Sequence, residues 1–174
     1  MKSHPLALFH YCPRCGSAAF TVADSRSKRC ADCHFTYYAN ASASAAAVVR
    51  KAQGEILLVR RAYAPAAGTL CFPGGFAEHG ESLETTCLRE LQEETGLRGH
   101  APKFLFSLPN LYVYSELTVH TLDSFFAVSV DDETALFAAD DASAVDWYPL
   151  SRDLLEQISL SSHREALRRL LENS

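Results

Sequence analysis

Apolar residues along the chain follow two different periods, and these predict a set of strands around one central helix. Alternating or continuous apolar runs rich in β-branched and aromatic residues are typical of strands, whereas a period near 3.6 is typical of helices. The strands expected on this basis cover residues 18–22, 27–30, 35–38, 45–50, 55–61, 103–106, 111–114, 118–130 and 144–148. Gly54 lies between two of them and predicts a hairpin of 45–50 with 55–61. Helices are expected from about 82 to 96, at 151–158, and from 161 or 162 to about 171. Periodicity alone therefore indicates an α+β or α/β protein.

The segment from Ser82 to Gly96 carries the most informative pattern. It contains good helix formers and no proline, and Gly96 supplies a left-handed stop. At about 100° per residue, Glu94 projects among the apolar residues, with Glu90 and Glu93 along their edge. Carboxylates are almost never buried without a partner, and hard oxygen ligands suit Mg²⁺ or Mn²⁺. The pattern therefore predicts a helix that binds a divalent metal ion.

Composition and charge narrow the class of protein. The 174 residues are 48% hydrophobic and 21% charged, which is typical of a soluble globular domain with a small appendage. The formal net charge of −5 argues against a general nucleic-acid binder. No apolar run reaches transmembrane length, and the apolar stretch near the N-terminus is too short for a signal peptide. We therefore expect a cytoplasmic protein that has no membrane partner.

Four of the six cysteines form a tight pattern near the N-terminus. Cys12-Pro-Arg-Cys15 and Cys30-Ala-Asp-Cys33 can deliver four thiolates tetrahedrally to one Zn²⁺. Gly16 follows the first pair and His34 the second, at positions where a positive φ is expected. Two disulfides or a redox pair are the alternatives. The pattern resembles a zinc ribbon, and we expect residues 1–40 to form a separate unit that is stabilised by the metal.

The helical segment and the residues before it resemble the Nudix box. That box is a glycine, five residues, a glutamate, seven residues, and then Arg-Glu-apolar-x-Glu-Glu-x-Gly-apolar. Every fixed position is present here, as Gly75, Glu81, Arg89, Glu90, Leu91, Glu93, Glu94, Gly96 and Leu97. The resemblance implies that residues 41–174 fold as an α/β/α Nudix sandwich with a mixed sheet, preceded by the ribbon. It also implies a metal-dependent pyrophosphohydrolase of nucleoside diphosphates linked to another group.

The same resemblance implies roles for the residues of the box. Glu90, Glu93, Glu94 and the carbonyl of Gly75 would hold Mg²⁺ or Mn²⁺, and Glu93 or Glu94 would also serve as the base. Glu81 would lie near the metals. Arg89 would orient the glutamates of the box through bidentate hydrogen bonds. Members of this family often take one more acid from a loop outside the box, and the candidates are Asp140 or Asp141, with a rival cluster at Asp131, Asp132 and Glu133.

A zinc ribbon in front of a Nudix domain is similar to the NADH pyrophosphatase group. That group carries Ser-Gln-Pro-Trp after the box, and the corresponding segment here is Ser107-Leu-Pro-Asn-Leu-Tyr112. Serine and proline match while glutamine and tryptophan do not, so an ADP-ribose-type substrate competes with NADH. The candidate substrate contacts are Phe72, Ser107, Tyr112 and Tyr114, although aromatic residues on strands are more often part of a core.

Two other functions stay open at this point. One is a non-catalytic Nudix domain that senses a nucleotide, and the other is a pyrophosphohydrolase of nucleoside triphosphates or capped RNA. The aromatic strands would also allow a homodimer, as is common among relatives.

Overall fold

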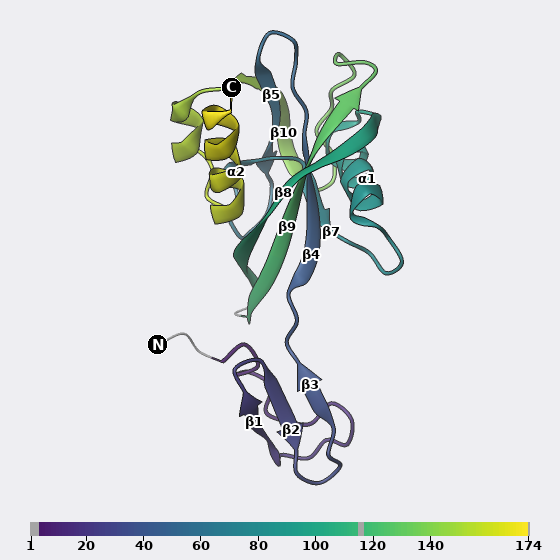
Figure 1. Cartoon of the computed structure of the whole chain (residues 1–174), viewed down its shortest axis with the longest axis vertical. Helices are drawn as coiled ribbons and strands as arrows, with labels where there is room; N and C mark the ends of the chain where they lie inside the picture. The colour runs from purple at the N-terminus through teal and green to yellow at the C-terminus, as the bar shows by residue number, and fades with distance from the viewer. Residues whose placement is uncertain (1–3, 115–116, 174) are drawn as a thin grey trace.

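The N-terminal unit of the protein is a small antiparallel sheet. The structure is a computed structural model, and it describes residues 4–114 and 117–173. In this unit, strands β1 (Phe20–Asp24), β2 (Ser27–Cys30) and β3 (Thr36–Tyr38) pair in the order β1-β2-β3. Phe20 and two of the cysteines form its small buried core. The unit lies at one end of the molecule and is joined to the larger part by a short extended segment (Figure 1).

The larger part contains two sheets. A four-stranded sheet has the order β7-β4-β9-β8, and it is mixed because β4 runs parallel to β9 while its other pairs are antiparallel. Its strands are β4 (Ser42–Val48), β7 (Gly74–Phe76), β8 (Gly99–Tyr114) and β9 (Leu117–Val130). A second, antiparallel sheet has the order β10-β5-β6, from β5 (Glu55–Arg61), β6 (Leu70–Cys71) and β10 (Ala142–Pro149).

Helices cover both faces of these sheets (Figure 1). Along β4, Ala45 and Ala47 face helix α1 (Leu83–Thr95), where they pack with Leu91 and Phe126. The alternate residue Ala46 faces helix α2 (Ser161–Glu172), in a core that also contains a short 3₁₀ helix, η1 (Arg152–Glu156). Successive side chains of a strand point to opposite faces, so β4 contributes to both cores. The predicted α/β/α sandwich with a mixed sheet is confirmed.

The expected hairpin of 45–50 with 55–61 is wrong for most of its length. In the described chain, the two segments meet at the Arg50–Ile56 bridge and at the hydrogen bond from the Leu57 N–H to the Val49 carbonyl, and a hydrogen bond from the Lys51 N–H to the Glu55 carbonyl closes the turn. Beyond that turn the strands separate into different sheets, β4 beside β9 and β5 beside β10. The turn was predicted correctly, but the partners of the strands are set by residues far away in the sequence.

Other boundaries also differ from the prediction. Residues 99–114 form one long strand with two register shifts, rather than separate strands at 103–106 and 111–114. Pro109 is tolerated inside it because β8 is an edge strand, where a missing N–H need not break a ladder. The expected helix at 151–158 is the 3₁₀ helix η1. Within the described ranges, no helix is both long enough and apolar enough to cross a membrane.

Candidate active site

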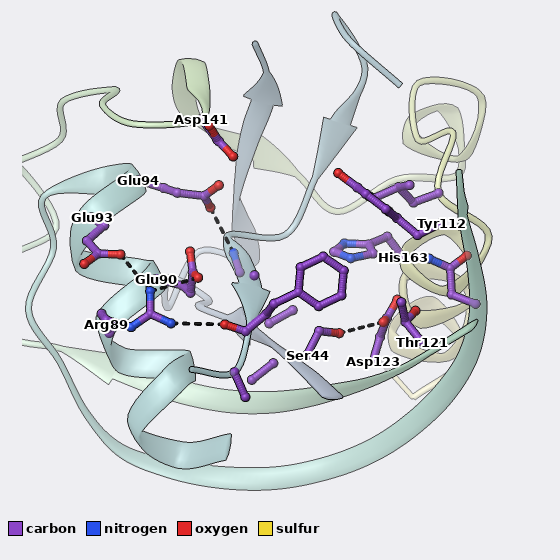
Figure 2. A pocket seen from close by; sticks show the side chains of 18 of the residues that line it. Ser44, Arg89, Glu90, Glu93, Glu94, Tyr112, Thr121, Asp123, Asp141 and His163 are labelled. Atoms are coloured by element: carbon purple, nitrogen blue, oxygen red, sulfur yellow. Dashed lines mark hydrogen bonds and ion pairs between the residues drawn. The ribbon is translucent and has the colours of Figure 1, made fainter. Parts of the chain in front are cut away.

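Helix α1 begins and ends where the sequence predicts. The Ser82 hydroxyl accepts a hydrogen bond from the Thr85 backbone N–H at 3.2 Å, which caps the first turn. At the other end Gly96 has φ 76° and donates its N–H to the Gln92 carbonyl. The caps fix the ends of the helix, and the packing of Cys87 and Leu91 against β4 fixes its rotation. The carboxylates of the helix then line a cavity of about 430 Å³ between α1, β4 and β7 (Figure 2).

Glu94 is the most deeply buried carboxylate of the cavity. Its side chain accepts the backbone N–H of Gly74 at 2.9 Å, and the residue is only 4% exposed. Burial raises the pKa of this carboxyl group to about 8, and the Gly74 hydrogen bond only partly opposes the rise. The positive charge of Arg61 also opposes the rise, but it does not offset the effect of burial.

Glu90 lies against the glycine that begins the box. A Cβ atom added to Gly75 would overlap the Glu90 carboxylate, so only glycine allows this approach. Burial raises the pKa of Glu90, and the neighbouring Arg89 guanidinium partly opposes that rise. The glycine therefore brings the backbone of β7 next to a carboxylate of α1.

Arg89 connects three carboxylates of the box. Its Nε and Nη2 donate to the two oxygens of Glu81 at 2.8 and 3.0 Å, while Nη1 donates to Glu90 at 2.9 Å and to Glu93 at 2.8 Å. Nη2 also donates to the Phe76 carbonyl on β7 at 3.1 Å. The guanidinium lowers the pKa of Glu81 to about 2, because its hydrogen bonds favour the ionised carboxylate. Arg89 therefore holds the acidic side chains in one arrangement and ties α1 to β7.

The donor set suits a divalent cation with hard oxygen ligands. Glu90, Glu93 and Glu94 line the cavity together with Gly75, and Asp140 and Asp141 also line it. The negative charge of Asp140 contributes to the raised pKa of Glu90, and that of Asp141 to the raised pKa of Glu94. A bound Mg²⁺ or Mn²⁺ would stabilise this arrangement, in which neighbouring carboxylates contribute to the raised pKa values of Glu90 and Glu94.

The rival acidic cluster lies outside this cavity. Asp131 is 3.4 Å from the imidazole of His100, and the Asp132 side chain accepts the backbone N–H of Thr134. The backbone carbonyl of Glu133 accepts the indole N–H of Trp147 at 3.3 Å. None of the three acids is among the cavity-lining residues of the described chain. Asp140 and Asp141, which directly precede β10, are therefore the better candidates for an acid outside the box.

The four N-terminal cysteines form a second candidate metal site. All their sulfurs lie within 4.8 Å of one another, with Cys12 and Cys33 at 3.6 Å and Cys15 and Cys30 at 3.7 Å. A tetrahedral site with Zn–S bonds of about 2.3 Å has sulfurs about 3.8 Å apart, so the residues fit zinc. All four are free thiols, and Gly16 and His34 have the expected positive φ, 74° and 60°. This geometry argues against two disulfides.

Of the four predicted substrate contacts, only Tyr112 lines the cavity. Its hydroxyl accepts a hydrogen bond from Arg61 at 3.0 Å, and its ring packs edge-on against Phe76. Phe72 is 0% exposed in the core beneath, so no face of its ring is open to a ligand. Ser107 and Tyr114 are exposed on β8 and lie outside the cavity. The expectation for Phe72, Ser107 and Tyr114 is therefore not supported.

Sequence reasoning missed one side of the cavity. Residues at that side are polar although they come from buried strands and a helix, namely Ser44, Arg61, Asn110, Thr121, Asp123 and His163. The available signal was weak, because Thr121 and Asp123 occupy alternate positions of β9 but the strand also contains the polar residues Thr118, His120, Ser124 and Ser129. Polar residues on the inward face of a strand indicate a site or a buried network.

Comparison with known proteins decides the family. A family model described as the NUDIX domain matches residues 41–170. The chain belongs to the Nudix family. Among its relatives, a NAD-capped RNA hydrolase NudC of Stutzerimonas stutzeri is 33% identical over 97 residues, which is 56% of this chain and 34% of the relative. An ADP-ribose pyrophosphatase of Methanocaldococcus jannaschii is 33% identical over 99 residues, 56% of each chain.

Solved structures agree with this assignment. A Nudix hydrolase of Nitrosomonas europaea superposes with a TM-score of 0.71 at 21% identity, covering 93% of this chain and 90% of its own. That likeness concerns the fold. The matched segments span about one third to a little over one half of the curated relatives. The Nudix resemblance of the box is confirmed, and the hydrolase class that it implied is the class of both relatives.

Proposed function

We propose that this Nudix protein is a metal-dependent pyrophosphohydrolase. It cleaves the central diphosphate of a nucleoside diphosphate linked to another group, of the ADP-ribose or dinucleotide type, into AMP and a second monophosphate. The observation that carries the proposal is the convergence of Glu90, Glu93 and Glu94 on one cavity, in a frame fixed by Arg89. Two relatives named for diphosphate substrates support the substrate class.

Each residue of the box then has a defined task. Glu90, Glu93, Glu94 and the Gly75 carbonyl hold Mg²⁺ or Mn²⁺, with Asp140 or Asp141 as a further acid. When bound, the metal supplies charge neutralisation at the diphosphate oxygens and activation of a water molecule. Glu93 or Glu94 accepts the proton of that water. Arg89 acts by positioning the carboxylates, because all its nitrogens donate to the protein.

Arg61 supplies a positive charge inside the cavity. Its Nε donates to the Pro65 carbonyl at 2.9 Å and its Nη2 to the Tyr112 hydroxyl, which holds the guanidinium at the cavity wall. The charge of Arg61 acts on both Glu94 and His163, which lie on opposite sides of the cavity (Figure 2). A cation whose charge reaches both sides suits a diphosphate that spans the cavity.

The two parts of the chain have separate tasks in this proposal. Residues 41–174 form the catalytic domain, and residues 1–40 form a zinc ribbon with a structural role. Four thiolates complete the coordination of Zn²⁺ and leave no open position for chemistry. We therefore assign the cluster of Cys12, Cys15, Cys30 and Cys33 to folding rather than to hydrolysis.

A hydrolysis screen tests the proposal. The protein is incubated with Mg²⁺ or Mn²⁺ and with NADH, NAD⁺, ADP-ribose, ADP-glucose, diadenosine polyphosphates, nucleoside triphosphates and a short RNA that carries NAD at its 5′ end. The last substrate contains the same diphosphate as NAD and is chosen because of the NudC relative. We expect AMP and a second monophosphate, or AMP-terminated products, from the diphosphate-linked compounds. Activity on nucleoside triphosphates alone would overturn the substrate class.

A further inference from the structure

The cavity has a polar end opposite the carboxylates of α1. The sheet face that packs toward α2 is apolar at Ala46, Leu108 and Phe125. Two residues further along each of these strands, the same face becomes polar. There Ser44 lies beside Asp123, and Asn110 lies beside Thr121. We call this group, with His163 of α2, the polar end: Ser44, Asn110, Thr121, Asp123 and His163 (Figure 2).

Asp123 places a negative charge in the polar end. The residue is 5% exposed, and its two oxygens accept hydrogen bonds from the hydroxyls of Ser44, at 2.6 Å, and Ser162. Both donors are neutral. In the described part of the chain, no ion pair involves Asp123. Each carboxylate oxygen can accept a further hydrogen bond, whereas an anion brought here would be repelled by the negative charge of Asp123.

Thr121 carries a hydroxyl without a hydrogen-bond partner in the described structure. Its Oγ1 atom is buried, the residue is 4% exposed, and it lines the cavity. The great majority of buried polar atoms in native proteins are hydrogen-bonded, and leaving one unpaired destabilises the fold. A ligand in the cavity would supply the partner that the protein does not.

The polar end also contains two hydrogen-bond donors. The Asn110 side-chain oxygen accepts from the Ser161 hydroxyl at 2.8 Å, so the amide N–H groups are left for another acceptor. The Nδ1 atom of His163 accepts the Phe72 backbone N–H at 3.2 Å, so the neutral ring carries its proton on Nε2. The polar end therefore contains both acceptors and donors.

We propose that the polar end binds an uncharged group of the substrate that both donates and accepts hydrogen bonds, and that it disfavours an anionic group in the same place. A sugar diol or the carboxamide or amine of a base has this chemistry. An acidic side chain that accepts from a ribose hydroxyl is a known way to select the unphosphorylated sugar. The inference rests on the proposed function, because a diphosphate held at α1 directs the rest of the substrate toward the polar end.

The unpaired hydroxyl gives the first test. We would measure thermal unfolding and the binding of ADP-ribose with a methylene group between its phosphorus atoms, which cannot be hydrolysed there. Thr121→Val keeps the side-chain shape but removes the hydroxyl. We expect the Tm to rise by about 2–4 °C and the Kd for the analogue to rise about tenfold. Thr118→Val, on the same strand but exposed, is the matched control and should change neither.

A variant that is more stable but binds the analogue more weakly identifies the Thr121 hydroxyl as a ligand contact rather than a structural contact. A lower Tm in Thr121→Val would mean that the hydroxyl already has a partner in the fold. An unchanged or lower Kd would mean that the ligand does not use it. Either result overturns the role of Thr121 in binding.

The charge of Asp123 gives the second test. NAD⁺ and NADP⁺ differ by a phosphate on a ribose, and NAD⁺ and nicotinic acid adenine dinucleotide differ by a carboxylate in place of a carboxamide. In one of these two pairs, the group that differs lies in the polar end. For that pair, we expect kcat/KM for NAD⁺ to exceed kcat/KM for the compound with the added negative charge by about tenfold or more. Asp123→Asn should reduce that preference to less than about threefold, while its Tm reports whether the fold is intact. The pair that responds identifies the group as sugar or base.

The two proposals fail in different ways. If the native protein hydrolyses none of these dinucleotides or ADP-ribose, the proposed function is wrong, and binding of the methylene analogue still decides the polar end. If the compounds are hydrolysed without preference in either pair, and Asp123→Asn does not change kcat/KM, the proposed role of the polar end is wrong and the proposed function stands.

Discussion

Arg89 and Glu81 form a two-point ion pair, with Nε 2.8 Å from Oε1 and Nη2 3.0 Å from Oε2. The remaining guanidinium nitrogen donates to Glu90 and Glu93, so one cation neutralises part of the charge of three carboxylates. Without it, these acids would repel one another and take other rotamers. The ion pair therefore fixes the positions of the proposed metal ligands before a metal binds.

Replacing the guanidinium should weaken metal binding. A lysine cannot reproduce the planar fork that reaches both Glu81 oxygens. We expect Arg89→Lys to raise the Mg²⁺ concentration for half-maximal activity, or to lower kcat, by about 10–100-fold, as is typical when a residue that orients metal ligands is lost. Rates measured over a Mg²⁺ titration test this. Arg98→Lys, at an exposed position, is the control, and unchanged values in Arg89→Lys would refute the positioning role.

The cysteine cluster should hold one zinc ion per chain. The sulfur distances of 3.6 and 3.7 Å suit tetrahedral thiolate coordination, which favours zinc over magnesium. We expect elemental analysis of purified protein to find one Zn²⁺, which is lost in Cys12→Ser or Cys30→Ser and kept in Cys87→Ala, whose thiol lies in the core of the larger part. Protein without zinc, or a mass that shows paired disulfides, would contradict this prediction.

His163 should make the fold sensitive to acid. Burial lowers its pKa from 6.5 to about 4, although the negative charge of Asp123 partly opposes this and the positive charge of Arg61 adds to it. Between these pH values the unfolded chain binds a proton that the folded chain does not, so stability is lost as the pH falls from 6.5 toward 4. The full difference corresponds to roughly 3 kcal/mol.

A variant isolates this contribution from other titrating groups. His163→Asn keeps an acceptor near the position of Nδ1 but does not titrate. Between pH 6.5 and pH 4, we expect the Tm of His163→Asn to fall by about 5–10 °C less than the Tm of the native protein. This difference corresponds to the roughly 3 kcal/mol of stability that the native protein loses through protonation of His163. His120→Asn, at an exposed position of β9, should follow the native protein. Equal slopes for native protein and His163→Asn would exclude His163 as the acid-sensitive group.

Tyr112 should contribute to substrate binding more than to turnover. Its ring lies in the cavity wall beside Phe76 and Arg61. If it stacks on a base, Tyr112→Ala should raise KM through the loss of about 1–3 kcal/mol, by analogy with stacking on single-stranded nucleic acids. The change in kcat should be smaller, because uniform binding is removed. Tyr112→Phe should retain most of the affinity, and Tyr114→Ala, 63% exposed, should have no effect. A large fall in kcat with KM unchanged would argue against stacking.

Local features of the fold followed well from the sequence. The N-cap at Ser82, the left-handed Gly96 and the positive φ of Gly16 and His34 are each determined by a few adjacent residues. The burial of Glu94 also followed from helical periodicity, because the angular position of a residue on a helix depends only on its number. Such features need no knowledge of distant partners.

Long-range pairing did not follow from the sequence. The alanine-rich start of β4 has little strand propensity, and it forms a strand because β7 and β9 pair with it on both sides. The polar end depends on the same pairing, since Ser44 meets Asp123 across 79 residues of sequence. From the sequence alone, Thr121 and Asp123 are indistinguishable from the solvated positions of an exposed strand. Their role became visible only when three strands were aligned.

In the proposed function, the carboxylates of α1 carry metal-dependent hydrolysis of a diphosphate. The most direct measurement is the rate of AMP release from the best substrate of the screen at saturating Mg²⁺, for the native protein, Glu93→Gln and Glu94→Gln. Glu84→Gln, an exposed acid in the first turn of the same helix, is the matched control. Circular dichroism shows whether each variant keeps its fold. We predict that both variants stay folded and lose at least about a hundredfold in turnover, which corresponds to roughly 2.7 kcal/mol of transition-state stabilisation, while the control keeps the native rate. Near-native turnover in both folded variants would contradict the account.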